Sequence, residues 1–360
     1  MKVAVLLNRL SGGGAERVGT TWAEGLRSHG HSVDVVVTHE PPSVDVQDCV
    51  RLEAGSFGRR IWKLRTLIRS QKYDVVVSLM PHWNVLSLLA VLASGKKVKT
   101  VISLHSLEAG MVKTHGLSFV AETLLARFLY RAADAVIAVS HAVGAEAKSK
   151  YNIERQKLWV VPNPVLDSLS GVGSARRSTK DSLALIYAGR LVGQKKPETL
   201  LYCAATLMNE SNIPTVRVEF FGAGPLEKSL RLEAERLGVP TIFHGWRADW
   251  SASCPSDGVL VLPSMVEGFG NVLVEAAAIG LPSVSSSRAL GVADAILPGV
   301  TGALAAGDHT ADYCDAIRQA IAVPPFTVSP WLERFTAEHA ASIVNRIIGE
   351  LGLKRTKADV

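Results

Sequence analysis

The residue types best suited to chemistry gather in the stretch Pro263–Asn271, which reads PSMVEGFGN, and in Glu275 just beyond it. An apolar strand is predicted to end there in a glycine loop, and a helix is predicted to begin near Asn271. Glu267 then lies in the loop, and Glu275 lies eight residues later, about one turn into the helix. Because carboxylates repel phosphate, we expect both to contact hydroxyl groups, and one carboxylate can accept hydrogen bonds from both hydroxyls of a ribose.

These carboxylates have a simpler interpretation, in which Glu267 caps the helix and Glu275 lies on its surface. The apolar run Val272–Ala278 argues against it, because this run predicts that Glu275 lies within a buried face. A buried carboxylate without a hydrogen-bonding partner is costly in free energy, so a binding role explains the pattern better.

Two cationic residues stand in another loop. The sequence AGRL at 188–191 follows a predicted strand, and Lys195 lies five positions beyond Arg190. A guanidinium group can hold two phosphate oxygens at once, and a lysine adds a mobile charge on the same group. Taken alone, the two residues are explained at least as well by a solvated basic loop.

A glycine loop follows the first predicted strand and reads GGGAER at 12–17. Glycines let the backbone approach an anion closely, and the amino end of a helix presents N–H groups to it. A tight turn between strand and helix is the alternative. Neither this loop nor GAGPLE at 222–227 completes the GxGxxG pattern, since Arg17 and Glu227 replace the third glycine, and we expect no nicotinamide or flavin cofactor.

Strands and helices alternate along the chain and must position these loops. Helical spacing of apolar residues occurs in segments such as Ala15–Arg27 and Leu117–Arg131. This alternation predicts an α/β fold with parallel, doubly wound sheets, whose ligands bind at the carboxyl ends of the strands. The short apolar runs typical of strands buried on both faces are Val3–Leu7, Val33–Val37, Val75–Ser78, Val98–Ser103, Ala135–Val139, Leu183–Ala188, Val216–Phe221, Thr241–His244, Val259–Leu262 and Pro282–Ser285.

The alternation stops near Val161–Asn163, and the Ser- and Gly-rich stretch Leu166–Asp181 that follows is typical of a linker. We therefore expect two facing Rossmann-like domains, 1–165 and 166–330. The remaining segment, 331–360, contains most of a helical stretch, Pro330–Leu351, which we expect to cross back to the first domain.

The composition, 48% hydrophobic and 20% charged, is that of a folded protein rather than a disordered one. No apolar stretch suits a membrane crossing or a signal peptide, so we expect a cytoplasmic protein.

No Asp-x-Asp triplet marks a metal site. The cysteines are scattered without zinc-ligand spacing and are expected to be reduced thiols: Cys49, Cys203, Cys254 and Cys314.

Together the motifs resemble the retaining GT-B glycosyltransferases of family 4, also called glycosyl transferases group 1, over nearly the whole chain. The resemblance implies a GT-B fold and transfer of a hexose or N-acetylhexosamine, with retention, from a nucleotide diphosphate, UDP before GDP. The family's frequent role is in bacterial cell-envelope glycan assembly. The order and spacing of the family's motifs are matched by GGGAERV, AVSHAV at 138–143, VVPNPV at 160–165, AGRLVGQKKP, FFGAGPLE and EGFGNVLVEAAAIGLP.

The resemblance also assigns roles to residues. Glu275 would hold the ribose hydroxyls, and Glu267 would lie near the transferred sugar. Arg190 and Lys195 would neutralise the leaving diphosphate in place of a metal, so no metal or other cofactor is implied. The remaining donor contacts would come from the loop Gly268, Phe269, Gly270 and Asn271, and from Gly13 and Gly14 of the first domain.

His105 follows a predicted strand in the sequence ISLHS. A structural role is the ordinary reading of an isolated histidine, but family members carry a histidine at a comparable strand end near the donor sugar, which implies a catalytic-site position. In such enzymes the leaving phosphate is thought to take the acceptor proton, so no side chain is assigned as a base. Lys196-Pro197 and Asp294 depart from the family pattern and bear on donor choice.

The first domain would bind the acceptor, and it is the basic one. Residues 1–165 hold 21 Lys and Arg against 13 Asp and Glu, whereas the remainder holds 18 against 20. Within it, Arg59–Arg69 reads as a basic amphipathic helix with Ile61, Leu64 and Ile68 on one face and Trp62 beside them. This helix either lies on an anionic membrane or packs on the sheet with its charges solvated.

A glycan or lipid-linked acceptor at the inner face of the cell membrane fits the first interpretation of that helix. Nucleic acid does not, since no binding motif for it is present. Two other functions use the same architecture. A sugar-nucleotide epimerase would not need Arg190, Lys195 and the two glutamates, and a catalytically silent nucleotide-sugar-binding protein would need the same site.

Overall fold

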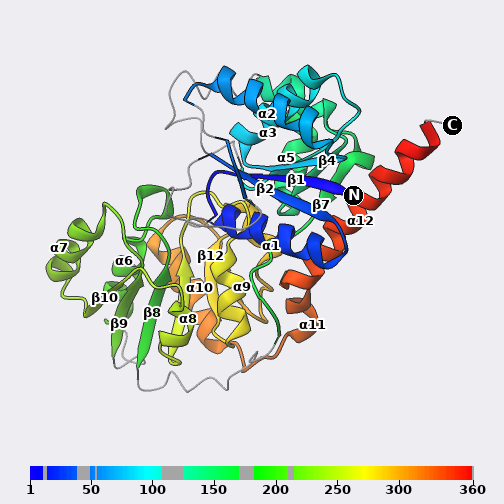
Figure 1. The fold of residues 1–360 in the computed structure, drawn as a ribbon. Helices are drawn as coiled ribbons and strands as arrows, with labels where there is room; N and C mark the ends of the chain where they lie inside the picture. The colour runs from blue at the N-terminus through cyan, green and yellow to red at the C-terminus, as the bar shows by residue number, and fades with distance from the viewer. Residues whose placement is uncertain are drawn as a thin grey trace. The chain divides into compact units, whose positions relative to one another are not determined.

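The computed structural model describes residues 1–10, 14–38, 49–52, 55–107, 125–169, 182–209 and 215–358, with the backbone alone at 354–358. The chain forms two compact units (Figure 1). Unit 1 comprises Met1–Asp167 together with Phe335–Val360, and unit 2 comprises Ser168–Arg334.

Unit 1 is built on a parallel sheet of seven strands in the order β3-β2-β1-β4-β5-β6-β7. Alternate residues of β1 enter two cores: Val3 and Val5 pack with helix α1, whereas Ala4 and Leu6 pack with helices α2 and α3. Helices therefore cover both faces, which explains why the inner strands are apolar nearly throughout. The strands are β1 (Lys2–Leu7), β2 (Ser32–Val37), β3 (Cys49–Arg51), β4 (Val75–Leu79), β5 (Lys99–Leu104), β6 (Ala135–Ala138) and β7 (Leu158–Val160).

Helices of unit 1 begin and end at recognisable caps. Ser56 accepts a hydrogen bond from the backbone of Arg59 at the start of α2, and Ser140 does the same for Val143 in α5. The helices are α1 (Gly14–Ser28), α2 (Phe57–Gln71), α3 (Pro81–Ser94), α5 (His141–Tyr151) and, near the end of the chain, α12 (Ala337–Ala358), with 3-10 turns η1 (Tyr130–Ala132) and η2 (Arg155–Lys157).

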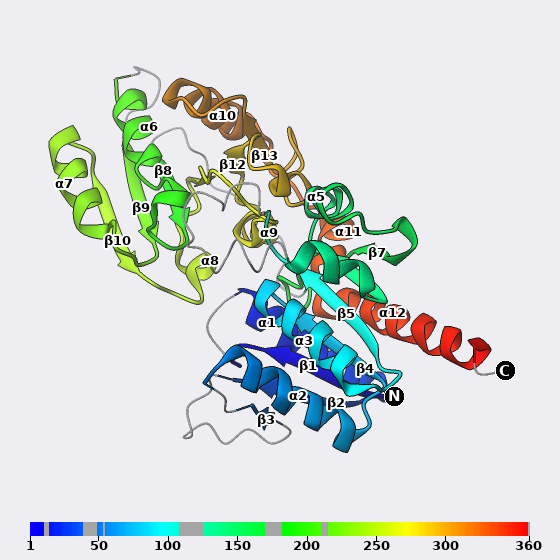
Figure 2. The same ribbon diagram turned by 90° about the horizontal axis from the view of Figure 1, so that it is seen from above.

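Helix α12 packs against α1 within unit 1, and Figures 1 and 2 show the two side by side. Val344, Ile347 and Ile348 of α12 are buried in the same core as Trp22 and Leu26 of α1. The predicted return of a C-terminal helix to the first domain is thereby confirmed.

The predicted helical segment Pro330–Leu351 is not continuous. It divides into α11 (Ser329–Leu332), a 3-10 turn η5 (Glu333–Phe335) and α12. At the break, the carbonyl of Phe335 accepts hydrogen bonds from the backbone N–H groups of Val165 and Leu166 instead of from a helical N–H group. Thr336 then caps the new helix by accepting a hydrogen bond from the backbone of His339.

Unit 2 contains a parallel sheet of six strands in the order β10-β9-β8-β11-β12-β13. One face packs against α6, α7 and α10 in a core that includes Tyr187, Phe220 and Ile317. The elements are β8 (Leu183–Ala188), η3 (Gly193–Lys195), α6 (Thr199–Leu207), β9 (Val216–Phe221), α7 (Glu227–Leu237), β10 (Thr241–Gly245), α8 (Trp250–Ser253), β11 (Gly258–Leu262), α9 (Asn271–Ala278), β12 (Ser283–Ser286), η4 (Leu290–Asp294), β13 (Gly302–Ala305) and α10 (Thr310–Ala322).

Both sheets are parallel, which confirms the predicted α/β fold. Part of the predicted helix Leu117–Arg131 and most of the predicted linker Leu166–Asp181 lie outside the described residues. Within the described ranges, no helix combines the length and the apolar character that a bilayer crossing requires.

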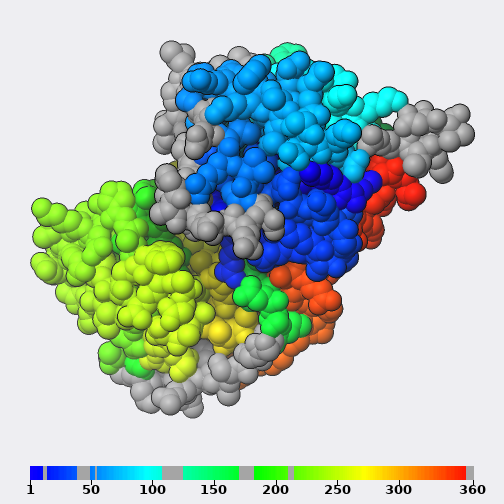
Figure 3. Space-filling model, viewed as in Figure 1, coloured from blue at the N-terminus to red at the C-terminus, as the bar shows by residue number. Residues whose placement is uncertain are grey.

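The structure corrects one interpretation of the basic helix, now α2. Its predicted apolar face is not available to a membrane, because Leu64 and Ile68 are fully buried in the core and Ile61 packs beside them. The basic side chains that flank this face donate inward, Arg65 to the carbonyl of Ala93 and Arg69 to that of Ser94. Trp62, in contrast, is 60% exposed. The blue segment that contains α2 forms part of the molecular surface seen in Figure 3.

Candidate functional site

The site in unit 2 lies where the strand order reverses, between the neighbouring strands β8 and β11. Connections leave this point in opposite directions, and ligands of doubly wound sheets bind there, beyond the carboxyl ends of the strands. The loop after β8 carries Arg190 and Lys195, and the loop after β11 carries Glu267. The topology alone thus places Arg190 and Glu267, which are 77 positions apart in the sequence, on adjoining loops.

Lys195 and Glu267 form an ion pair between these loops, from the lysine Nζ to the carboxylate Oε1. Both side chains are largely buried, with 21% and 10% exposed. The backbone joins the same loops, since the N–H of Met265 donates to the carbonyl of Gln194 over 3.0 Å. Lys195, predicted to serve the diphosphate, and Glu267, predicted to lie near the sugar, therefore contact each other directly.

Glycines allow the backbone to support these loops closely. A Cβ on Gly291 of η4 would lie 2.3 Å from the carbonyl oxygen of Glu267, and one on Gly222 would lie 1.8 Å from that of Gly189. Neither contact is compatible with a side chain, so the GAGPLE motif serves close packing against the AGRL loop. Gly270, the residue before α9, has a φ of 95°, a conformation that favours glycine.

Tyr187 supports the loop that carries Arg190. Its hydroxyl donates to the carbonyl of Arg190 over 2.7 Å. Burial raises the pKa of Tyr187, and the negative charge of Glu267 raises it further, so the phenol stays a neutral donor. The Arg190 side chain itself is exposed, as a group that must meet a soluble anion should be.

Glu275 lies in α9 and is half-buried. The indole Nε1–H of Trp250 donates a hydrogen bond to its Oε2. Sequence reasoning predicted ribose hydroxyls as the contacts of this carboxylate and did not predict Trp250. The signal available was weak: a tryptophan in a polar stretch, whose N–H needs an acceptor once it is buried.

In unit 1, His105 lies directly beyond β5, as predicted. Its Nε2 is 3.0 Å from the hydroxyl of Ser103, and its ring centroid is 6.3 Å from that of Trp22. Burial lowers the pKa of His105 to about 4, although a hydrogen bond with Asn163 acts in the opposite direction. The imidazole is therefore neutral near pH 7 and can both donate and accept a hydrogen bond.

A buried polar network stands behind this histidine, and sequence reasoning missed it. Asn84 of α3 donates to the backbone carbonyl of Ser103 over 2.8 Å, and its own Oδ1 accepts from Ser78 over 2.9 Å. The hydroxyl of Ser87 lies 2.9 Å from that of Ser78. The available signal was the set of polar residues that interrupts the apolar stretch from Val75 to Gly95, since buried polar groups require partners.

The structure thus brings Lys195 and Glu267 together, with Arg190 on the same loop. Gly268, Phe269 and Gly270 are buried, and Asn271 begins α9. Gly14 is the first residue of α1, whereas Gly13 lies outside the described residues. Among the described side chains, no group of three or more His, Cys, Asp or Glu is arranged to hold a metal ion.

Two family models match the chain: Glycosyltransferase Family 4 over residues 12–168 and Glycosyl transferases group 1 over residues 182–322. Among curated proteins, the GalNAc-alpha-(1->4)-GalNAc-alpha-(1->3)-diNAcBac-PP-undecaprenol alpha-1,4-N-acetyl-D-galactosaminyltransferase of Campylobacter jejuni is 28% identical over 313 residues, with 82% of both chains covered. The D-inositol 3-phosphate glycosyltransferase of Streptomyces avermitilis is 33% identical over 230 residues, which cover 58% of this chain and 48% of that one.

Solved structures share the fold. The lipopolysaccharide outer core galactosyltransferase WaaB matches with a TM-score of 0.79 and 20% identity, covering 97% of this chain and 99% of that one. Anabaena HepE, in complex with UDP, matches with a TM-score of 0.69 and 18% identity over 100% of both chains. With family models matched in each unit, the chain belongs to glycosyltransferase family 4 and is a GT-B enzyme that transfers a sugar from a nucleotide sugar.

Proposed function

We propose that this enzyme is a retaining, metal-independent glycosyltransferase that uses a nucleoside diphosphate sugar, UDP-linked first of all, and a glycan or lipid-linked acceptor. The product would belong to envelope polysaccharide or glycolipid synthesis. The observation that supports the donor site best is the largely buried Lys195–Glu267 pair at the strand-order reversal of unit 2.

The donor would be held by three kinds of contact. Glu275 accepts hydrogen bonds from the ribose hydroxyls, while the exposed guanidinium of Arg190 holds diphosphate oxygens. Lys195, already beside Glu267, supplies a second positive charge to the diphosphate. Because the ion pair with Glu267 fixes Lys195 before the reaction, this cation stabilises the leaving group without first having to be reorganised. Glu267 would then contact hydroxyls of the transferred sugar.

The reaction would proceed on one face of the sugar. The bond from the anomeric carbon to the diphosphate oxygen breaks, and the acceptor oxygen bonds to that carbon from the same side, which retains the configuration. The acceptor proton passes to the departing phosphate oxygen, so the charge balance closes without a side-chain base. His105, neutral at pH 7, would hydrogen-bond a sugar hydroxyl at the reaction centre.

A thermal-shift series tests the donor site. Wild-type protein and Glu275→Ala are heated with UDP, GDP and their sugars in the presence of a chelator. We expect one nucleoside diphosphate to raise the melting temperature of the wild type in chelator and to lose most of this effect in the variant. Absence of any shift, or a shift that requires divalent metal, would contradict the proposed site.

The acceptor class rests on the relatives. The Campylobacter protein is by its name an enzyme of an undecaprenol-linked glycan, and WaaB is one of lipopolysaccharide. Turnover of the bound donor with undecaprenol-diphosphate glycans, compared with free oligosaccharides, would establish the acceptor. A protein that binds donor but transfers sugar to none of these acceptors, and leaves it unchanged, would support the silent binding protein instead.

Peripheral contact with an anionic membrane at the inner face of the cell membrane remains part of the proposal, through the outer surface of α2. Trp62 and Arg59 are exposed there, and no apolar face is left to insert, so the contact would be mainly electrostatic. We expect sedimentation with anionic liposomes at low salt to fall in the double variant Arg59→Ala, Trp62→Ala. Equal sedimentation of variant and wild type would remove α2 from the proposal.

A further inference from the structure

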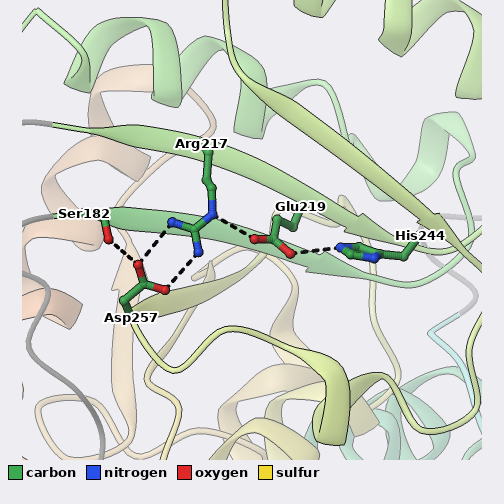
Figure 4. Close-up of polar contacts among 5 residues, drawn as sticks. All are labelled: Ser182, Arg217, Glu219, His244 and Asp257. Atoms are coloured by element: carbon green, nitrogen blue, oxygen red, sulfur yellow. Dashed lines mark hydrogen bonds and ion pairs between the residues drawn. The ribbon is translucent and has the colours of Figure 1, made fainter.

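A row of charged side chains crosses the α8 side of the unit 2 sheet and ends near the site. Arg217 of β9 donates two hydrogen bonds to Asp257, over 3.1 and 3.0 Å, and one to Glu219 over 2.8 Å. The other oxygen of Glu219 lies 2.9 Å from Nε2 of His244 in β10. Figure 4 shows Arg217 between the two carboxylates and Glu219 between Arg217 and His244.

Aromatic rings continue this row toward α9. The ring of His244 stacks on that of Phe221 with centroids 4.1 Å apart and planes 8° apart. Phe221, the last residue of β9, in turn packs against Trp250, with centroids 6.2 Å apart. Trp250 is 6% exposed, and its Nε1–H donates to Glu275. A fixed set of rings therefore connects the row of charges to the carboxylate proposed to hold the ribose.

We propose that Trp250 is a positioning residue, held in place by the Phe221 and His244 rings, that orients the Glu275 carboxylate toward the ribose hydroxyls. This inference rests on the proposed function, in which Glu275 is the ribose anchor. A glutamate side chain loses rotational freedom when it binds, and a partner that fixes its rotamer beforehand reduces that loss. The indole N–H can only donate, so it pairs with the carboxylate without competing for the hydroxyl protons.

The chemistry of the ligand follows from this geometry. The indole N–H of Trp250 donates to one oxygen of Glu275. An ionised carboxylate accepts several hydrogen bonds at once, so the proposed partners of this group are a pair of vicinal hydroxyls. Nucleotides that lack these hydroxyls gain nothing from the arrangement. The effect of Trp250 should therefore be specific to ribonucleotides.

The test uses the full chain and the variant Trp250→Phe, which keeps a buried ring and removes the N–H. We expect the dissociation constant for UDP to rise about tenfold, the range of one hydrogen bond to a charged group. KM for the donor should rise by the same factor, with the loss falling on KM rather than on kcat. With 2′,3′-dideoxy-UDP as the probe, wild type and variant should bind alike.

A double-mutant cycle separates positioning from a general structural effect. In the background of Glu275→Ala, we expect Trp250→Phe to change UDP binding less than twofold, because its only route to the ribose is gone. A further tenfold loss in that background, or an equal loss with the dideoxy probe, would overturn the inference. Tyr202→Phe is the matched control, since it removes another hydrogen bond from an aromatic donor to a glutamate, Glu233, between α6 and α7.

A second variant covers the case in which Trp250→Phe does not fold. Phe221→Leu keeps apolar volume but removes the flat ring against which Trp250 packs, and a ribose-dependent loss of about threefold is expected, smaller because the N–H remains. Failure of this inference is distinguishable from failure of the proposed function. If Glu275→Ala itself leaves UDP binding unchanged, the ribose anchor is wrong; if it weakens binding while both ring variants do not, only the role of Trp250 is wrong.

Discussion

The sheets of the two units follow the same order over six strands, to which unit 1 adds β7 at one edge. The order reverses between β1 and β4 in unit 1 and between β8 and β11 in unit 2. They differ in what their faces carry. The charges in the unit 2 sheet include Arg217 and Glu219 within β9, and Glu219 is only 5% exposed. In unit 1, the buried polar groups behind His105 are neutral hydroxyls and an amide, such as Asn84.

The difference shows how one scaffold serves two kinds of chemistry. In unit 2 the partly buried charges hold one another rigidly, because each would be less stable without its partners. Such rigidity suits the proposed binding of an anionic nucleotide. Burial keeps the imidazole of His105 uncharged, which suits the proposed hydrogen bond to a sugar hydroxyl. The strand order supplies the position of each site, and the residues beyond the strands supply its chemistry.

The largest expected effect belongs to the charges of unit 2. Lys195→Ala should lower kcat by about 100- to 1,000-fold, the usual cost of removing one preorganised group that stabilises a leaving oxyanion. Steady-state turnover with saturating donor measures it. Lys196→Asn is the control, because asparagine tolerates the φ of 46° at that position, and it should change kcat less than threefold. Similar losses in both variants would mean that the loop, not the charge of Lys195, matters.

The next largest difference between the units is expected in how much stability each loses when a charged partner is removed. Arg217→Met leaves Glu219 and Asp257 without their shared cation, and we expect unit 2 to lose about 3 kcal/mol of its free energy of unfolding. The matched change in unit 1, Lys99→Met, removes a more exposed pair with Asp134, whose side chains are 29% and 27% exposed, and should cost at most about 1 kcal/mol. Hydrogen exchange of β9 and β5 amides reports each unit separately. Equal losses of unfolding free energy in the two variants would contradict the proposed difference between the units.

A smaller effect is expected from His105→Asn, which should lower kcat about tenfold while leaving the dissociation constant of UDP unchanged. The reason is that the proposed nucleotide contacts belong to unit 2, whereas an amide replaces only part of the imidazole's hydrogen bonding. Single-turnover rates and calorimetric binding on the same preparation measure the two quantities. A loss of nucleotide affinity in this variant would contradict the role of His105 at the transferred sugar.

The smallest effect concerns pH. Because the folded state lowers the pKa of His105 from 6.5 to about 4, the unfolded chain takes up the proton first as the solution is acidified. The stability that comes from the neutral imidazole is complete above about pH 6.5 and is lost as pH falls toward 4. Denaturant midpoints of unit 1 across this range should fall less steeply in His105→Asn than in wild type. An equally steep fall in the two proteins would contradict a lowered pKa of His105.

Strand prediction failed in a consistent way. The three strands that the sequence analysis did not predict, β3, β7 and β13, are each at an edge of a sheet and have three or four residues. Strands this short show no apolar run of their own, and their pairing is decided by the neighbouring strand. The inner strands were predicted nearly to the residue, because burial on both faces demands a continuous apolar run.

The basic helix illustrates a limit of periodicity. Its pattern correctly predicted α2 and the face shared by Ile61, Leu64 and Ile68, but an amphipathic helix reads the same whether its apolar face meets a membrane or a protein core. The packing of Leu64 and Ile68 against α3 and the sheet decided for the core.

The sequence by itself determined the α/β class, the parallel sheets, the start of α9 at Asn271 and the family motifs, since these depend on local composition and on the order of segments. Only the tertiary structure decided which side chains meet. The pairing of Lys195 with Glu267, the contact of Trp250 with Glu275 and the neutral state of His105 depend on partners far away in the sequence and on burial, and no local pattern of residues encodes either.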